Sequence, residues 1–188
     1  MQLLNPDEGR FALSYAREAI LMHLTGKRIA EPVWPEIFSR NRGVFVTLTL
    51  NGELRGCIGY PYPHVPLSQA LHDAACSAAT TDPRFPPVQP GEMNLITVEV
   101  TVLTEPVLLT AYPDQRESMI TVGRHGLIVT GSGRSGLLLP QVAVEWNWNS
   151  REFLDHTCIK AGLPAKSWLE SSVQVFTFEG QIFSEKSD

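Results

Sequence analysis

Residues 44–59 read VFVTLTLNGELRGCIG, and this stretch decides the fold because two strand patterns flank a tight turn. Residues 44–50 are rich in β-branched side chains and alternate along the chain, which predicts a strand. Asn51-Gly52 follows, and this pair is the strongest short hairpin signal because both residues tolerate positive φ. Residues 53–59 have the pattern of a returning strand. The segment therefore predicts a β-hairpin.

The register of this hairpin follows from the length of its loop. A two-residue loop sets three cross-strand pairs, which are Leu50 with Glu53, Leu48 with Arg55, and Val46 with Cys57. Strand periodicity then puts Arg55 and Cys57 on one apolar face. A guanidinium beside a thiol on such a face needs an anion, a partner carboxylate or access to solvent. Gly56 and Gly59, which flank the thiol, would let another backbone or a ligand approach closely.

Helical and strand patterns alternate irregularly along the rest of the chain. The predicted helices run from Pro6 to a cap at Gly26, from about Pro66 to Thr80, from Pro140 through Trp146, and from a cap at Asn149 with Glu152 to a stop at Gly162. The further strands are expected at Leu95–Leu103, Gly126–Thr130, Gly136–Leu139 and Val173–Phe183. These elements predict an α+β fold with a mainly antiparallel sheet flanked by helices.

Composition sets the broad class of the protein. The chain has 188 residues, of which 43% are hydrophobic and 19% charged, so it is expected to fold. No apolar run approaches the ~18 residues that a membrane span needs, and the first residues lack the pattern of a secretory signal. The three cysteines, none in a Cys-x-x-Cys pair, indicate free thiols in a reducing compartment. We therefore expect a cytoplasmic protein without a membrane segment.

The charge balance bears on nucleic acid as a partner. The 15 Lys and Arg residues against 20 Asp and Glu residues give a formal net charge of −5, which argues against a broad basic footprint. Arg10, Arg17, Lys27 and Arg28 could edge a local basic strip, but no aromatic side chains for base stacking are interleaved with them. Nucleic acid stays open as a ligand without support from the net charge.

Two motifs have simpler explanations than their letters suggest. Residues 131–136, GSGRSG, match the dinucleotide pattern G-x-G-x-x-G, but a strand follows them instead of the helix that must hold the pyrophosphate. We interpret them as a hairpin loop.

His72 and Cys76 lie four apart on a helix, yet a zinc site needs three or four ligands and no second Cys/His pair stands nearby. Cys158 is expected in the core. We therefore expect neither a metal nor a cofactor.

Cys57 is the candidate for chemistry. Thiolates are stabilised beside cations, and Arg55 on the same predicted face would supply one. His125, within GRHG at residues 123–126, is a candidate base if the fold brings it near. The alternative is a buried structural cysteine, with Arg55 paired to a carboxylate such as Glu99. Residues 81–87, TDPRFPP, form a fixed loop that is expected to present Asp82, Arg84 and Phe85.

The hexapeptide LRGCIG at residues 54–59 is the signature of the AMMECR domain family, which this chain resembles. Later blocks resemble the family in the same order: DPRFPP at 82–87, VEVTVL at 98–103, GRHGL at 123–127, LPQVA at 139–143 and KAGLP at 160–164. The likeness covers nearly the whole chain. Short stand-alone forms such as this one resemble the AmmeMemoRadiSam system protein A group, found beside a Memo-like protein and a radical SAM enzyme.

The resemblance implies more about the fold than about the reaction. It implies that residues 1–188 form one AMMECR-like domain of two interleaved subdomains, with the hexapeptide at or near the cleft between them. No settled reaction comes with the family, which has been suggested to act in nucleic-acid metabolism or RNA modification. The chain departs from the usual pattern at Tyr60, where Thr or Ser commonly stands, and at Gln141, where Glu is commoner. We therefore give Gln141 no role in proton transfer.

The first functional hypothesis is a thiol enzyme. Cys57 would be the nucleophile or covalent acceptor, Arg55 would stabilise the thiolate or an anionic substrate, and His125 or Glu99 would move protons. The predicted substrate side comprises Gly56, Gly59, Asp82, Arg84 and Glu99. The ligand expected there is a small molecule or a modified nucleotide.

The second hypothesis is a binding or assembly module, in which a Memo-like protein or a radical SAM enzyme does the chemistry. The chain has neither the cysteine triplet of an iron–sulfur site nor a nucleotide loop, which favours such a division of labour. Phe85, Trp146 and Trp148 could anchor an interface, although packing in the core explains them as well. An RNA-modification factor is the third hypothesis.

Overall fold

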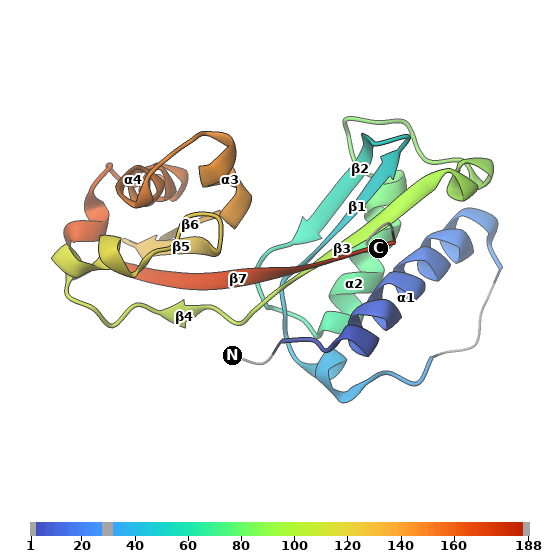
Figure 1. Cartoon of the computed structure of the whole chain (residues 1–188), viewed down its shortest axis with the longest axis horizontal. Helices are drawn as coiled ribbons and strands as arrows, with labels where there is room; N and C mark the ends of the chain where they lie inside the picture. The colour runs from blue at the N-terminus through green and yellow to red at the C-terminus, as the bar shows by residue number, and fades with distance from the viewer. Residues whose placement is uncertain (1–2, 28–31, 186–188) are drawn as a thin grey trace. The chain divides into compact units, whose positions relative to one another are not determined.

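The computed structural model describes residues 3–27 and 32–185, and Figure 1 labels their elements. The chain divides into two compact units. Residues 1–103 together with 181–188 form unit 1, and residues 104–180 form unit 2. Strand β7 (Gln174–Ser184) begins in unit 2 and ends in unit 1, so two separate stretches of chain build unit 1.

Helix α1 (Pro6–Thr25) begins where the sequence predicts, because Asn5 and Glu8 form a reciprocal capping box at its N-terminus. The Asn5 side chain accepts the Glu8 backbone N–H at 2.9 Å, and the Glu8 carboxylate accepts the Asn5 backbone N–H at 2.7 Å. These bonds satisfy N–H groups that the first turn leaves without helical partners. The helix ends at Gly26, whose φ of 68° favours glycine.

The sheet of unit 1 contains β1 (Val44–Leu50), β2 (Glu53–Tyr60) and β3 (Ile96–Leu103), in the order β2-β1-β3 with β7 next to β3. Both pairings of β1 are antiparallel. Helices α1 and α2 (Leu67–Thr80) pack on one face of this sheet (Figure 1). Val46, Leu48 and Val98 are fully buried on that face. Strand β2 is therefore the edge of the sheet.

The hairpin register departs from the prediction after its first pairs. Leu50 lies opposite Glu53 as expected, but a β-bulge shifts the pairing between Leu48 and Thr49. Leu48 consequently pairs with Gly56, and Thr47 pairs with Cys57. The predicted pairs of Leu48 with Arg55 and Val46 with Cys57 are wrong, because one extra residue in a bulge reverses the faces of all residues beyond it.

Unit 2 combines a small antiparallel sheet with two helices. The sheet contains β4 (Val107–Leu108), β5 (His125–Gly131), β6 (Arg134–Leu138) and the first part of β7, with β5 between β6 and β7. Helices α3 (Pro140–Glu145) and α4 (Ser150–Lys160) pack on β5 and β6. Phe153, Leu154 and Cys158 are fully buried there, which confirms the expectation that Cys158 belongs to the core.

Residues 131–136 belong to the β5–β6 hairpin, as predicted, with Ser132 and Gly133 in the turn and the other four residues in the two strands. Ser132 and Gly133 have φ values of 51° and 71°, which are typical of a two-residue hairpin loop. The short strand β4 and the four 3-10 helices of the described residues have no counterpart among the predicted elements: η1 (Glu36–Ser39), η2 (Pro90–Asn94), η3 (Pro113–Met119) and η4 (Ser167–Leu169). Such elements are too short to show a hydrophobic period.

The fold class is α+β, with helices packed on antiparallel strands, as predicted. In the part of the chain that the structure describes, no helix combines the length and apolarity needed to cross a membrane.

Candidate functional site

Cys57 lies on the face of the unit 1 sheet that points away from α1 and α2. The bulge puts it opposite Thr47, and its Sγ lies 3.3 Å from the Thr47 hydroxyl. Thr47 is in turn paired with Glu99 on β3, so the three side chains form one row across three strands. All three residues are partly exposed. The row therefore combines a thiol, a hydroxyl and a carboxylate on an accessible surface.

The backbone of Cys57 is held at both of its polar groups. Its N–H donates to Asp82 Oδ2 at 2.8 Å, and its carbonyl oxygen accepts from Arg84 Nη2 at 3.1 Å. These backbone groups lie on the outer side of an edge strand, where no further strand of the described residues of unit 1 pairs with them. The Asp82–Arg84 pair thus takes the place of a neighbouring strand at the residue that carries the thiol.

Asp82 and Arg84 are joined by an ion pair within the same loop. Arg84 Nε donates to Asp82 Oδ1 at 2.9 Å and Nη2 donates to Oδ2 at 2.7 Å, while the Arg84 backbone N–H donates to Oδ1 at 3.1 Å. These bonds, led by those from the guanidinium, hold the pKa of Asp82 far below its usual range against the opposing effect of burial. Asp82 raises the pKa of Arg84, and the charge of Cys57 adds to that effect.

The two side chains of this pair differ in exposure. The Asp82 side chain is 3% exposed and that of Arg84 is 53% exposed. The expectation that the loop presents Asp82 is therefore wrong, because the carboxylate turns inward to accept N–H groups. Arg84 is presented, and its guanidinium carbon lies 5.5 Å from the centre of the Phe85 ring. Arg84 is thus the member of the pair that a ligand can contact.

Arg55 has a different role in the packing of unit 1. Its Nε and Nη2 donate to the two carboxylate oxygens of Glu92 at 2.9 and 3.1 Å. The guanidinium also donates to the carbonyl oxygens of Pro86 at 2.9 Å and Pro87 at 3.4 Å. Arg55 lowers the pKa of Glu92 below its ordinary value through these bonds. The carboxylate partner is Glu92 and not Glu99, and Arg55 anchors η2 and its preceding loop to the bulge.

Gly56 and Gly59 are positions of close approach, as predicted, and the approaching atoms belong to the protein. A Cβ at Gly56 would collide with the carbonyl oxygen of Ala78 in α2. A Cβ at Gly59 would lie 2.6 Å from the carbonyl oxygen of Val44 and would overlap the Phe45 ring. Gly56 therefore lets β2 lie directly on α2.

His125 begins β5 in unit 2, whereas Cys57 lies on β2 in unit 1. Its Nδ1 accepts the Thr121 backbone N–H at 3.1 Å. Burial lowers the pKa of His125 below its ordinary value, while the nearby Glu179 acts in the opposite direction. A neutral imidazole is the form that can accept a proton. Its service as a base for Cys57 stays a prediction, as does the cleft between the two subdomains.

His72 and Cys76 belong to a small network in the helical layer. The Tyr15 hydroxyl lies 3.0 Å from His72 Nδ1, and His72 Nε2 lies 3.9 Å from Cys76 Sγ. Burial, aided by the charge of Asp73, raises the pKa of the Cys76 thiol. Within residues 3–27 and 32–185, no three His, Cys, Asp or Glu side chains gather in a way that could hold a metal ion.

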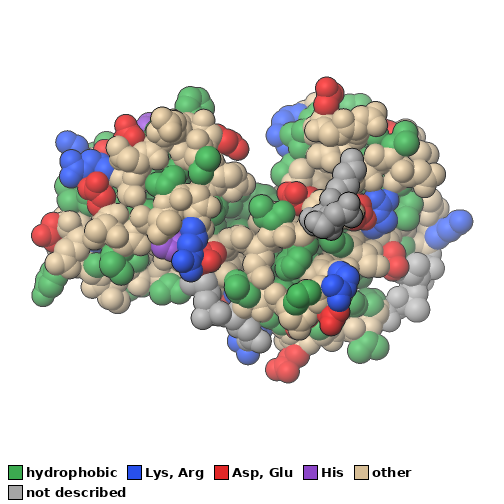
Figure 2. All heavy atoms as spheres, in the orientation of Figure 1, with side chains coloured by type: hydrophobic (Ala, Val, Ile, Leu, Met, Phe, Trp, Pro, Cys, Tyr) green, Lys and Arg blue, Asp and Glu red, His purple; other side chains and the backbone are tan. Residues whose placement is uncertain are grey.

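Two of the four basic residues considered as a strip, Arg10 and Arg17, form ion pairs. Arg10 pairs with Asp7, and Arg17 pairs with Glu185 at 2.5 Å. Lys27 is exposed, and Arg28 lies outside the described residues. On the face drawn in Figure 2, the blue Lys and Arg side chains are scattered and several stand beside red carboxylates. The face drawn in Figure 2 therefore lacks the continuous basic surface that tracks a phosphate backbone.

Two residues of the site, Thr47 and Glu92, are not among those predicted from the sequence. Thr47 contacts the thiol and Glu92 pairs with Arg55. A signal existed for Glu92, because Gln89 and Glu92 have the spacing of a capping box and begin η2. No signal existed for Thr47, because the bulge that brings it opposite Cys57 has no local sequence pattern.

The fold and the site define a class of α+β protein in which an edge-strand thiol is held by an Asp–Arg pair from a proline-rich loop. The chain belongs to the AMMECR1 family, whose model matches residues 13–183.

Relatives and a solved structure cover nearly the whole chain. Protein MJ0810 of Methanocaldococcus jannaschii is 50% identical over 98% of this chain and 94% of its own length. A protein of Methanothermobacter thermautotrophicus is 52% identical over 97% and 96% of the two chains. The crystal structure of the uncharacterized protein PH0010 from Pyrococcus horikoshii matches with a TM-score of 0.80 and 47% identity, covering 97% of this chain and 94% of that one.

Proposed function

We propose that this AMMECR1-family protein is a component of an AmmeMemoRadiSam-type system, in which Cys57 performs thiol-dependent chemistry on a small molecule or nucleotide. The environment of the thiol carries this proposal. Cys57 Sγ lies beside the Thr47 hydroxyl on an accessible sheet face, and hydrogen bonds fix its backbone on both sides. A fixed, partly exposed thiol near a cation is the setting in which cysteines react.

The chemical step is a substitution at an electrophilic carbon. The Cys57 sulfur forms a bond to that carbon, and the bond from the carbon to its leaving group breaks with the electron pair going to the leaving group. The thiol proton passes to Glu99 through the Thr47 hydroxyl, which lies between them in the row. His125 is the alternative base. A second nucleophile then forms a bond to the same carbon, the carbon–sulfur bond breaks with its electron pair going to sulfur, and the proton held by Glu99 returns to restore the thiol.

Arg84 takes the role of the cation in this proposal. Arg55, which the sequence suggests for that role, directs its guanidinium at Glu92 and two carbonyl oxygens. The Arg84 guanidinium instead donates to the Cys57 carbonyl oxygen, and half of its side chain is exposed. It is therefore placed to stabilise the thiolate and an anionic group of a ligand.

The test uses p-nitrophenyl acetate as a generic electrophile. Attack by Cys57 releases p-nitrophenolate, and peptide mass mapping locates the acetyl group. We expect acetylation of Cys57 at pH 7, its loss in Cys57→Ser, and none at Cys158, which is buried. Arg84→Gln should lower the rate of release by about three- to ten-fold, because a single charge–charge contact near the surface is worth ~1 kcal/mol.

Arg84→Lys and Arg151→Gln are the controls. The lysine keeps the charge and should retain most of the rate, whereas Arg151 pairs with Glu117 in unit 2 and its loss should change nothing. Release at the same rate in Cys57→Ser, or an equal loss in Arg84→Lys and Arg84→Gln, would count against the proposed chemistry.

The second candidate is a non-catalytic binding or assembly module for a Memo-like protein and a radical SAM enzyme. One observation favours it. Trp146 in unit 2 is 67% exposed and stacks on Trp148 with the ring centres 6.0 Å apart. Trp148 in turn stacks on His156 with the ring centres 3.8 Å apart. Exposed tryptophans held by neighbouring rings are frequent anchors of protein interfaces.

Size-exclusion chromatography of the purified proteins tests this candidate. At micromolar concentration, the chain should co-elute with the Memo-like or the radical SAM partner, and Trp146→Ala should weaken the complex by ten-fold or more, roughly the effect of an interface hot spot. Tyr112, which is 75% exposed in the same unit, supplies the control variant Tyr112→Ala. Separate elution of all three proteins would argue against this candidate.

A further inference from the structure

A cavity of about 200 Å³ lies in unit 1 where β2 ends and α2 begins. Its lining consists of Tyr60, Pro61, Tyr62, His64, Val65, Gln69 and Asp73. All of these residues follow the hexapeptide in the chain, and none belongs to the Cys57 row. The cavity is therefore a separate feature of the same unit, and its test does not depend on the proposed chemistry of Cys57.

The loop that forms one wall of the cavity is fixed in place. Pro61, Pro63 and Pro66 restrict its backbone. The Pro61 carbonyl oxygen lies so close to Gly43 that a Cβ there would be 2.5 Å away, and the Leu67 N–H donates to the Arg40 carbonyl oxygen at 2.9 Å. The wall therefore needs no ordering when a ligand binds, which lowers the free-energy cost of binding.

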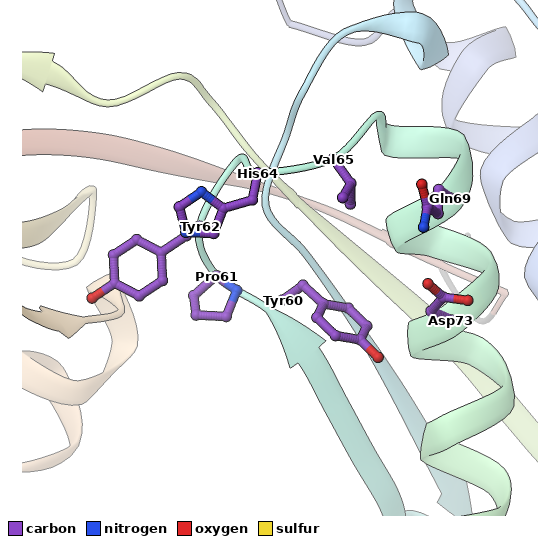
Figure 3. A pocket seen from close by; sticks show the side chains of 7 residues that line it. All are labelled: Tyr60, Pro61, Tyr62, His64, Val65, Gln69 and Asp73. Atoms are coloured by element: carbon purple, nitrogen blue, oxygen red, sulfur yellow. The ribbon is translucent and has the colours of Figure 1, made fainter.

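Aromatic rings form much of the lining. Tyr62 and His64 stack with their ring centres 5.6 Å apart and an interplanar angle of 20°. Tyr60 contributes a third ring from the end of β2, as Figure 3 shows. Rings of tyrosine attract cations through their electron-rich faces. No Lys or Arg side chain belongs to the lining.

A carboxylate stands across the cavity from the Tyr60 ring. Asp73 and Gln69 lie four residues apart on α2 and both line the cavity, and Figure 3 shows the Tyr60 ring reaching from the end of β2 toward this side of the helix. In the described part of the chain, the Asp73 carboxylate forms no ion pair or hydrogen bond. The same holds for the Gln69 amide and the Tyr60 hydroxyl. These three polar groups therefore line one cavity without a hydrogen-bonding partner among the described residues.

We propose that this cavity binds a small organic cation, a protonated amine or a guanidinium on a short apolar or aromatic stem. The charged head pairs with Asp73 and donates further hydrogen bonds to the Gln69 amide oxygen and the Tyr60 hydroxyl oxygen, and the stem lies against the rings. The volume is below the 300 Å³ or so typical of drug-sized ligands. The occupant is therefore either a free amine of low mass or one basic side chain of a partner.

Isothermal titration calorimetry with tyramine tests the proposal, and amide NMR shifts locate the site. Tyramine should bind with a Kd of about 1 mM and shift the amides of Tyr60, Gln69 and Asp73. The matched neutral probe 4-ethylphenol should bind about ten-fold more weakly, because it lacks the charged head. Added salt should weaken the binding of tyramine but not that of 4-ethylphenol.

Asp73→Asn keeps the shape of the side chain and removes its charge. It should weaken tyramine about ten-fold and leave 4-ethylphenol unchanged. Asp114→Asn, at an exposed carboxylate in unit 2, is the control and should retain full affinity. Tyr60→Phe, which keeps the ring, should reduce affinity by a smaller factor. Cys57→Ser should bind tyramine like the parent protein, which separates this test from that of the thiol chemistry.

Nα-acetyl-arginine amide distinguishes the two sources of the cation. Tighter binding of this probe than of tyramine would assign the cavity to a partner's side chain, and the reverse order would assign it to a free amine. Equal binding of tyramine and 4-ethylphenol would overturn the proposal. So would unchanged tyramine affinity in Asp73→Asn, or the lack of saturable shifts at about ten times the expected Kd.

Discussion

The Asp82 carboxylate accepts the backbone N–H of Cys57 at 2.8 Å, although the two residues are 25 positions apart in the chain. The same carboxylate accepts hydrogen bonds from the Arg84 guanidinium, which in turn donates to the Cys57 carbonyl oxygen. One buried carboxylate therefore closes the edge of the sheet at the residue that carries the thiol. The Asp82 carboxylate also fixes the position of the exposed Arg84 guanidinium.

Asp82→Asn should lower the free energy of unfolding by about 2–3 kcal/mol. The neutral amide keeps the size of the side chain but loses charge-assisted hydrogen bonds to Arg84 and leaves a buried group without its full set of partners. Urea unfolding followed by circular dichroism measures the change. Asp114→Asn in unit 2 is the control and should stay within ~0.5 kcal/mol of the parent; an equal loss in both variants would contradict the assigned role of Asp82.

Acidification should destabilise the protein through Asp82 and Glu92. The pKa of each is lowered in the folded state by an arginine, Arg84 for Asp82 and Arg55 for Glu92. The unfolded chain therefore binds more protons than the folded one below about pH 4–5, and stability is fully present above that range and falls as pH decreases. Thermal melting between about pH 7 and pH 3 should show the decline in Tm. In Asp82→Asn the decline of Tm with decreasing pH should be shallower. A decline as steep as that of the parent protein would exclude Asp82 as a source of the pH dependence.

Gly56→Ala should be strongly destabilising, by about 2 kcal/mol or more. The new methyl group would collide with the Ala78 carbonyl oxygen, a backbone atom that moves only if α2 moves. Gly91→Ala is the matched control, because a Cβ at Gly91 meets no atom within 4 Å. Chemical denaturation of the two variants side by side gives the comparison. Equal stability of Gly56→Ala and Gly91→Ala would show that β2 does not lie as close to α2 as described.

Arg55 and Glu92 should be energetically coupled. Two parallel hydrogen bonds join them and their side chains are 12% and 28% exposed, so a double-mutant cycle should give a coupling energy of about 1–2 kcal/mol. The cycle uses Arg55→Gln, Glu92→Gln and the double variant, measured by urea unfolding. The exposed pair of Arg151 and Glu117 supplies a reference cycle, for which we expect less than about 0.5 kcal/mol. Additive effects at Arg55 and Glu92 would contradict the pairing.

The starts of several helices and one tight turn could be predicted from the sequence, because capping and turn residues mark them. Asn5 and Glu8 mark the start of α1, Asn51-Gly52 marks the β1–β2 turn, and Asn149 with Glu152 marks the start of α4. Each of these signals acts within a few residues, because a cap or a tight turn is satisfied by its own neighbours. The fold class and the family followed from these elements and from the hexapeptide.

The site was predicted in part. Cys57, Asp82 and Arg84 were named as neighbours in one region, and the structure joins them by hydrogen bonds. The predicted pairing of Cys57 with the apolar Val46 is wrong, because a bulge leaves Arg55 without a partner on β1, and Arg55 instead binds residues far along the chain. A local pattern does not contain those contacts.

The sequence by itself determined the hairpin and the capped helices. It also showed that residues 131–136 belong to a hairpin and not to a dinucleotide site, and it contains the motif that identifies the family. Only the tertiary structure decided which face carries Cys57, which carboxylate holds Arg55, and which side chains converge on the cavity beside Tyr60. The physical reason is the range of the interactions. Caps and turns are satisfied locally, whereas a bulged register, a buried ion pair and a cavity depend on segments that meet only when the chain has folded.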